Sequence, residues 1–188
     1  MYKFNESTNE KKMAILNTKT TYGFISKLFH WIMAIMIIVA WLLGTFHDDV
    51  GDLKRTFIIT HYTLGITIFL MVGFRLMWRW LNTKPEHLLE NKILNKISTT
   101  VFTLFYSLMF IIPLSGYILM NLRGRNPVYF GYEIPALLSK NDSWKGFAKE
   151  THEILGMILL ILFVLHVVAA LYHHYIRKDQ TLTRMSFK

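Results

Sequence analysis

The sequence predicts an all-α integral membrane protein, a four-helix bundle. Four long apolar stretches, at 28–46, 57–80, 97–122 and 154–172, approach or exceed the roughly 20 residues that a membrane-crossing helix needs. Hydrophobic residues make up 53% of the chain and charged residues only 18%, below the roughly one quarter that is usual in soluble domains. A helix of a soluble bundle would also carry a polar stripe, and these four apolar segments lack one.

The charged residues flank the apolar stretches and predict an orientation. The net charge is +9, but the basic residues do not crowd one polar surface, so no nucleic-acid partner is expected. Lys and Arg in 1–27, 75–96 and 177–188 outnumber those in the other two loops by two to one. The positive-inside rule therefore predicts that both termini are cytoplasmic. Residues 1–21 are expected to be a polar cytoplasmic tail, and 22–188 a single transmembrane domain.

The chain contains no cysteine. This excludes disulfides, thiolate metal sites, iron–sulfur clusters and covalent CxxCH attachment of haem. A metal would need histidine, methionine or oxygen ligands, and a haem would be bound non-covalently.

Histidines within the membrane spans are the candidate functional residues, because an ionisable residue there is costly. Four of the eight histidines lie in or at the edge of the predicted spans: His30, His61, His152 and His166. A lone histidine of this kind is more often a hydrogen-bonded core residue. Four of them, with no Asp or Glu in any span, argue against a proton relay and predict ligands for haem iron.

The spacing of these histidines predicts two haems. His152 and His166 are fourteen residues apart, so they share a helix face and lie roughly 21 Å apart along the axis. The second and fourth spans both enter from outside, which makes His61 and His152 the expected outer pair. His30 lies in the inner half, and its partner is either His166 or His173. Helix periodicity does not distinguish these two, and counting depth from the start of the first span favours His173.

Two further features accompany the histidines. The segments THYTLG at 60–65 and THEILG at 151–156 each place a glycine four residues after a histidine, on the same face. Gly65 and Gly156 are therefore expected to let a flat macrocycle lie against the backbone, although small-residue helix packing is an alternative. Arg75 lies fourteen residues after His61 and is expected to pair with a haem propionate or, equally, to be a charge at the inner rim.

The sequence resembles the bacterial cytochrome b561 family, especially its small stand-alone di-haem members. The matching segments are FHWI at 29–32, THYTLG, GYILMNLRGRNPVYFGYEIP at 116–135, THEILG and HVVAALYHHYIRKDQTLTRM at 166–185. The resemblance implies two non-covalent b-type haems with ligand pairs His30/His166 and His61/His152. It also implies a place in the bacterial inner membrane and electron transfer with quinone, such as ubiquinone.

Some small members of that family are described as superoxide oxidases, which pass electrons from superoxide to ubiquinone. A basic outer surface would attract superoxide, and the sequence offers Arg123, Arg125, Lys140, Lys145 and Lys149. One alternative is a cytochrome subunit that anchors a larger dehydrogenase or hydrogenase, with a soluble redox partner. Another is a haem-free transporter.

Overall fold

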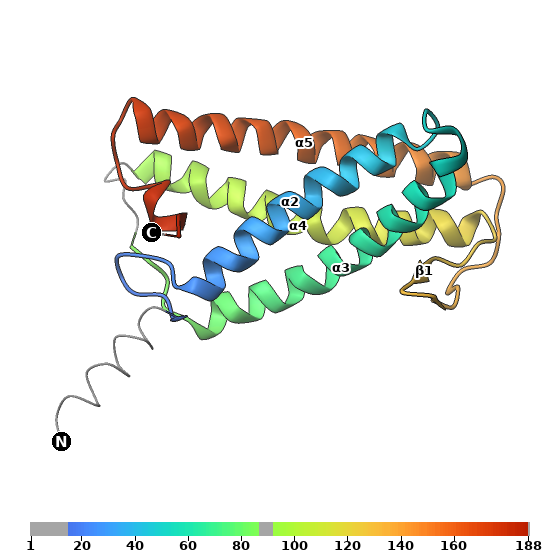
Figure 1. The fold of residues 1–188 in the computed structure, drawn as a ribbon, viewed down its shortest axis with the longest axis horizontal. Coiled ribbons are helices and arrows are strands. Elements are labelled where there is room, and N and C mark those ends of the chain that lie inside the picture. Colours follow the sequence, from blue (N-terminus) through green and yellow to red (C-terminus); the bar gives the residue numbers. More distant parts are fainter. Residues whose placement is uncertain (1–14, 87–91, 188) are drawn as a thin grey trace, which may run out of the picture.

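The computed structural model describes residues 15–86 and 92–187, and it is a bundle of four long helices (Figure 1). The helices are α2 (Phe24–Phe46), α3 (Lys54–Leu81), α4 (Lys92–Leu122) and α5 (Lys145–Tyr175). Each is long and apolar enough to cross a membrane. The predicted all-α membrane bundle is confirmed. Six of the eight predicted span ends fall inside a longer helix, because polar flanks continue the helix beyond the apolar stretch, and the other two coincide with the ends of α2 and α4.

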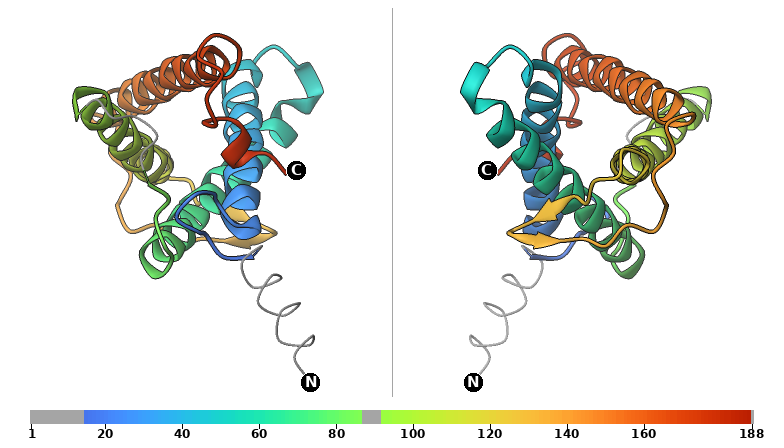
Figure 2. Two further views of the ribbon diagram at one scale, coloured as in Figure 1. Left: turned by 90° about the vertical axis from the view of Figure 1, so that its left-hand side faces the viewer. Right: turned by 90° about the vertical axis from the view of Figure 1, so that its right-hand side faces the viewer.

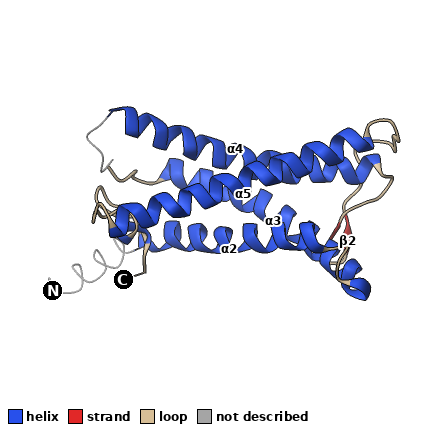
Figure 3. Ribbon diagram, turned by 90° about the horizontal axis from the view of Figure 1, so that it is seen from above, coloured by secondary structure: helices blue, strands red, loops and turns tan. Residues whose placement is uncertain are grey.

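The remaining elements are short (Figure 3). They are the 3-10 helices η1 (Gly51–Leu53) and η2 (Thr183–Met185) and the strands β1 (Val128–Tyr129) and β2 (Tyr132–Glu133). The antiparallel strands turn through Phe130 and Gly131, both with positive φ, as a two-residue hairpin requires. Both termini of the described chain lie at one end of the bundle and this hairpin lies at the other. We call these the termini end and the hairpin end.

Helix packing follows the chain order but does not close into a ring. Among the described residues, the extensive contacts run from α2 to α3, from α3 to α4 and from α4 to α5. The buried core lies between the first three helices and contains Met33, Val72 and Met109, whereas α5 contributes Leu159 as its one buried residue. The end-on views show α5 on the side of the bundle opposite α3 (Figure 2). Helix α5 is therefore held away from α2 and α3.

The end of α4 sets the course of the loop at the hairpin end. The N–H of Arg125 donates to the carbonyl of Met120, and the N–H of Gly124 donates to that of Asn121. Gly124 has φ +70°, so this is a Schellman motif, in which glycine permits the left-handed conformation. The side-chain oxygen of Asn121, which is fully buried, then accepts from the N–H groups of Leu137 and Leu138 at 2.8 and 3.2 Å.

Candidate haem-binding site

The four predicted histidines meet in two pairs across the spaces between α5 and the other helices. The rings of His30 on α2 and His166 on α5 have centroids 6.1 Å apart, and those of His61 on α3 and His152 on α5 are 6.0 Å apart. Imidazoles that share one metal ion through bonds of about 2 Å have centroids roughly 6 Å apart. Both separations therefore suit one iron between the rings. Among the described residues no cluster of three or more His, Asp or Glu could hold a metal, so the arrangement is strictly paired.

The structure places His166 beside His30, where depth counting favoured His173. The His173 ring instead lies at the termini end, with Nδ1 at 2.5 Å from a carboxylate oxygen of Asp179. Depth counting fails here because α2 begins at Phe24, four residues before the apolar stretch, so His30 lies deeper than that stretch suggests.

The histidines of the hairpin-end pair are oriented by hydrogen bonds at Nδ1. His61 Nδ1 donates to the backbone carbonyl of Ala40 at 2.7 Å. His152 Nδ1 donates to the carbonyl of Ile112 at 3.1 Å and also lies 3.0 Å from Ser115 Oγ. A carbonyl at Nδ1 fixes the proton there and leaves Nε2 with a free lone pair, which is the form that binds a metal.

Two glycines that the sequence analysis did not single out make room for these rings. A Cβ added at Gly44 would lie 2.7 Å from Cε1 of His61, and one added at Gly116 would lie 3.0 Å from Cε1 of His152. Both separations are shorter than ordinary van der Waals contact, about 3.5–4.0 Å. Each histidine ring is therefore seated directly against the backbone of a neighbouring helix.

Gly65 and Gly156, the glycines that the sequence favoured, have a different environment. A Cβ added at either position would meet no atom within 4 Å, although both residues are half-buried. Their helix faces are therefore open beside the histidine pairs. Their part in accommodating a macrocycle stays a prediction.

Arg75 distinguishes the termini-end pair from the hairpin-end pair. Its Nη2 lies 3.3 Å from Nδ1 of His30, and its guanidinium lies over the ring of Tyr106 at 5.7 Å from the centroid. The ring of Phe105 packs against His166 with centroids 5.5 Å apart. Among the described residues Arg75 forms no ion pair with a carboxylate. A half-buried cation without an anionic partner in the described chain fits a ligand that carries carboxylates, as haem does.

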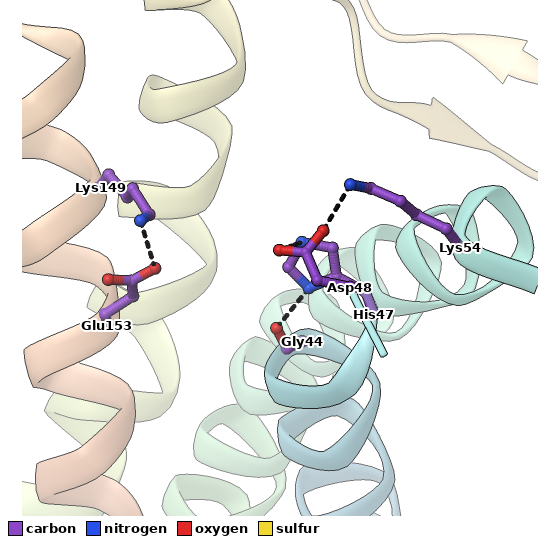
Figure 4. A network of polar contacts seen from close by, with 6 residues as sticks. All are labelled: Gly44, His47, Asp48, Lys54, Lys149 and Glu153. Carbon is purple, nitrogen blue, oxygen red and sulfur yellow. Dashed lines mark hydrogen bonds and ion pairs between the residues drawn. The ribbon is translucent and has the colours of Figure 1, made fainter. Parts of the chain in front are cut away.

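The hairpin end carries a network of charges beside the second pair (Figure 4). His47 Nδ1 donates to the carbonyl of Gly44 at 2.8 Å, and its Nε2 lies 3.5 Å from the carboxylate of Asp48. Asp48 also pairs with Lys54. The hydrogen bond from Lys54 and the nearby His47 hold the pKa of Asp48 below its usual value.

The basic surface expected at this end is smaller than the sequence suggested. Lys145 and Lys140 both pair with Asp142 and lower the pKa of that carboxyl, with the hydrogen bond from Lys145 as the largest single cause. Lys149 pairs with Glu153 at 3.5 Å (Figure 4).

The remaining positive charges of this surface are two arginines. Arg123 and Arg125 are exposed and form no ion pair within the described ranges. They leave the hairpin end with a localised positive charge.

A bundle of four apolar helices with two pairs of facing histidines in its interior is typical of a membrane cytochrome b. Comparison with known proteins agrees: the sequence model of prokaryotic cytochrome b561 matches residues 21–188. The chain belongs to this family and is a haem-binding membrane protein of electron transport. Its membership favours haem binding over the haem-free transporter that was considered from the sequence.

Three relatives show how the similarity is distributed. Cytochrome b561 homolog 2 of Escherichia coli K12 is 31% identical over 180 residues, which cover 92% of this chain and 95% of the relative. Cytochrome b561 homolog 1 of the same organism is 26% identical over 160 residues, 83% of this chain and 91% of the relative. The probable superoxide oxidase CybB of Yersinia pestis is 24% identical over 158 residues, 83% and 90% of the two chains.

Proposed function

We propose that the chain holds two b-type haems, one between His30 and His166 and one between His61 and His152, and carries electrons from superoxide to a quinone. The observation that supports this most strongly is the separation of the two ring pairs, 6.1 and 6.0 Å between centroids. Residues 22–188 would form the transmembrane domain, and 1–21 a cytoplasmic tail.

Helix α5 supplies one ligand to each pair and sets the distance between them. Fourteen residues of helix separate His152 from His166, which is roughly 21 Å along the axis. The two irons would therefore lie toward opposite membrane surfaces. With both termini on the cytoplasmic side, as the positive-inside rule favours, the His61/His152 pair would face outward.

Bound haem supplies one-electron chemistry, and the chain's own residues decide how that chemistry is used. Two histidine ligands to each iron would leave no position for oxygen at the metal, which favours outer-sphere electron transfer. Ala40, Ile112 and Ser115 would keep the hairpin-end imidazoles in the coordinating form. Arg75 would pair with a propionate at the termini end.

The proposed reaction balances with two electrons. Two superoxide anions each give up one electron and leave as dioxygen, and one quinone takes both electrons with two protons to become a quinol. Arg123 and Arg125 would raise the local concentration of superoxide at the outer surface, since a localised positive charge attracts a small anion. The name of the Yersinia relative supports superoxide as the donor.

The test is stopped-flow mixing of the purified holoprotein with superoxide and a short-chain ubiquinone. We expect the reduced haem band to form first and quinol to follow with half the stoichiometry of superoxide consumed. If superoxide left the haem oxidised and an added soluble redox protein reduced the haem rapidly, the result would favour the anchor-subunit alternative instead.

Charge reversal tests the superoxide step separately. Arg123→Glu with Arg125→Glu should slow haem reduction by roughly tenfold at low salt and much less at 0.5 M salt, where the screening length is only about 4 Å. The matched control is Lys92→Glu with Lys96→Glu on α4 at the termini end, which should leave the rate unchanged. Equal rates for wild type and the double arginine variant at both salt concentrations would remove the arginines from the mechanism.

A further inference from the structure

A pocket at the termini end extends from Arg75, beside the termini-end histidine pair, outward to residues that have no part in the proposed electron path. Helix α3 lines it with Arg75, Trp78 and Arg79, and α4 lines it with Phe102 and Tyr106. Its floor comes from three segments outside these two helices: the chain before and at the start of α2, the loop after α3, and η2. The pocket therefore joins parts of the chain that are far apart in the sequence.

The described lining is cationic. Arg75, Arg79 and Lys84 line the pocket, and no Asp or Glu of the described residues does. None of the three forms an ion pair within residues 15–86 and 92–187. At the hairpin end, by contrast, the lysines of the loop are paired with Asp142. Unpaired cations that converge on one hollow favour an anionic occupant.

The cations are held in place by aromatic rings. The guanidinium of Arg79 lies over the ring of Phe102 at 5.4 Å from the centroid, as that of Arg75 does over Tyr106. Trp78 Nε1 donates to Ser26 Oγ at 3.1 Å, which fixes the wall between α2 and α3. Cation–π contacts of this kind orient a guanidinium without neutralising it, so its N–H groups remain available to a ligand.

The C-terminal segment completes the floor of the pocket. Trp31 Nε1 donates to the carbonyl of Met185 at 2.9 Å, and Met185 lines the pocket. Arg184 Nη1 donates to the carbonyl of Glu86 at 2.7 Å, whereas its buried Nε has no hydrogen-bond partner in the part of the chain that the structure describes. The carboxylate of Glu86 is exposed and does not line the pocket. Arg184 does not line the pocket either, so this segment contributes Met185 to the floor and holds the loop after α3 beside it.

The position of the pocket along the helices indicates which kind of anion binds there. Arg79 lies near the end of α3, which ends at Leu81, and Lys84 follows in the loop. Arg75 lies one helical turn deeper, about 6 Å, and is already beside His30. Cations at the end of a membrane helix meet the phosphates of lipid headgroups, and basic pockets between helices on the cytoplasmic side bind anionic lipids.

We propose that Arg79 and Lys84, with Trp78 and Phe102 as apolar walls, bind the phosphate headgroup of an anionic membrane lipid. The lipid would join α3, α4 and the C-terminal segment at the cytoplasmic surface. The site does not depend on which histidines bind haem.

Native mass spectrometry of the holoprotein from nanodiscs that contain phosphatidylcholine and phosphatidylglycerol tests this. Wild type should retain one phosphatidylglycerol after delipidation, and Arg79→Gln with Lys84→Gln should bind it at least tenfold more weakly. The control pair Lys92→Gln and Lys96→Gln lies at the same membrane surface outside the pocket and should bind as wild type does.

Two further arms identify the ligand. Millimolar inorganic phosphate should leave phosphatidylglycerol bound, and displacement by phosphate alone would overturn the lipid as the ligand. Equal retention by wild type and the Arg79/Lys84 variant, or displacement by short-chain ubiquinone, would overturn the proposal. Haem content is measured in the same samples, so loss of lipid with full haem separates this site from the proposed haem ligands.

Discussion

Substitution of Gly44 by alanine is expected to disrupt the hairpin-end haem site specifically. The new Cβ would lie 2.7 Å from Cε1 and 2.8 Å from Nδ1 of His61. Ordinary contact requires about 3.5–4.0 Å, so the ring must move by roughly 1 Å. That movement stretches the hydrogen bond from His61 Nδ1 to the Ala40 carbonyl, now 2.7 Å, beyond useful length.

The size of the expected effect of Gly44→Ala has two contributions, overpacking and the loss of a hydrogen bond. Overpacking of this kind costs about 1–3 kcal/mol of stability. Loss of the hydrogen bond that orients a metal-bound histidine lowers affinity by about 10- to 100-fold. Gly116→Ala places its Cβ 3.0 Å from His152, so we expect a smaller effect in the same direction.

The assay is the pyridine haemochrome ratio of haem to protein, together with a redox titration. Gly44→Ala should lose most of one haem, and the other should titrate as in wild type. The matched control is Gly73→Ala on α3, an exposed helix position where an added Cβ meets no atom within 4 Å. It should retain both haems and gain up to about 1 kcal/mol from helix propensity. Unchanged haem content and potentials in Gly44→Ala would refute the inferred seat of His61.

Three more predictions follow from the same contacts. Arg75→Gln should lower the midpoint potential of the termini-end haem and leave the other unchanged, as seen by redox titration, because a nearby positive charge favours reduced iron. Asn121→Ala should leave the N–H of Leu138 without its acceptor, at roughly 1–3 kcal/mol, whereas the N–H of Leu137 keeps the Tyr117 hydroxyl at 3.0 Å, and the change should speed proteolysis of the 123–144 loop. Burial raises the pKa of Asp179, but hydrogen bonds from His173 and Thr181 outweigh it and lower the pKa from 3.8 to about 2. The extra stability of wild type over Asp179→Asn should therefore be full above pH 3.8 and disappear as the pH falls through about 2 in a thermal-unfolding series.

Hydropathy was sufficient to locate the four membrane helices but not their ends. The polar segments before Phe57 and before Ile154 are helical as well, since α3 begins at Lys54 and α5 at Lys145. A hydropathy window marks where the membrane is, and helix formation needs only compatible residues beyond it. Helix α2 likewise begins at Phe24, four residues before its apolar stretch, so His30 lies further along its helix than depth counting assumed, and the ring nearest to it is that of His166 and not His173.

Helix periodicity was the strongest signal for the candidate site. Fourteen residues return to nearly the same face after roughly 21 Å. His152 and His166 have this spacing on α5, and His61 and Arg75 have it on α3. His30 and Gly44 have it on α2, so the same rule pointed to Gly44, which now lies against His61. Unlike Gly65 and Gly156, Gly44 does not follow a histidine by four residues, and the residue that it accommodates is on another helix.

Other parts of the site had no signal in the sequence. The carbonyl of Ala40 acts through its backbone, which every residue type carries, so only the packing of α2 on α3 brings it to His61. The ion pairs that neutralise the lysines at the hairpin end could not be predicted from the sequence either. Lys140 and Asp142 are neighbours in any loop, but whether their side chains pair depends on how the loop folds after Gly124.

The central claim is that the four histidines bind two irons in the pairs seen here. The most direct measurement is the haem content and redox titration of His30→Ala, His61→Ala, His152→Ala, His166→Ala and, as a control, His173→Ala. His61→Ala and His152→Ala should remove the same haem, His30→Ala and His166→Ala should remove the other, and His173→Ala should keep both. Loss of one haem in His173→Ala, or of the same haem in His30→Ala and His61→Ala, would contradict the pairing.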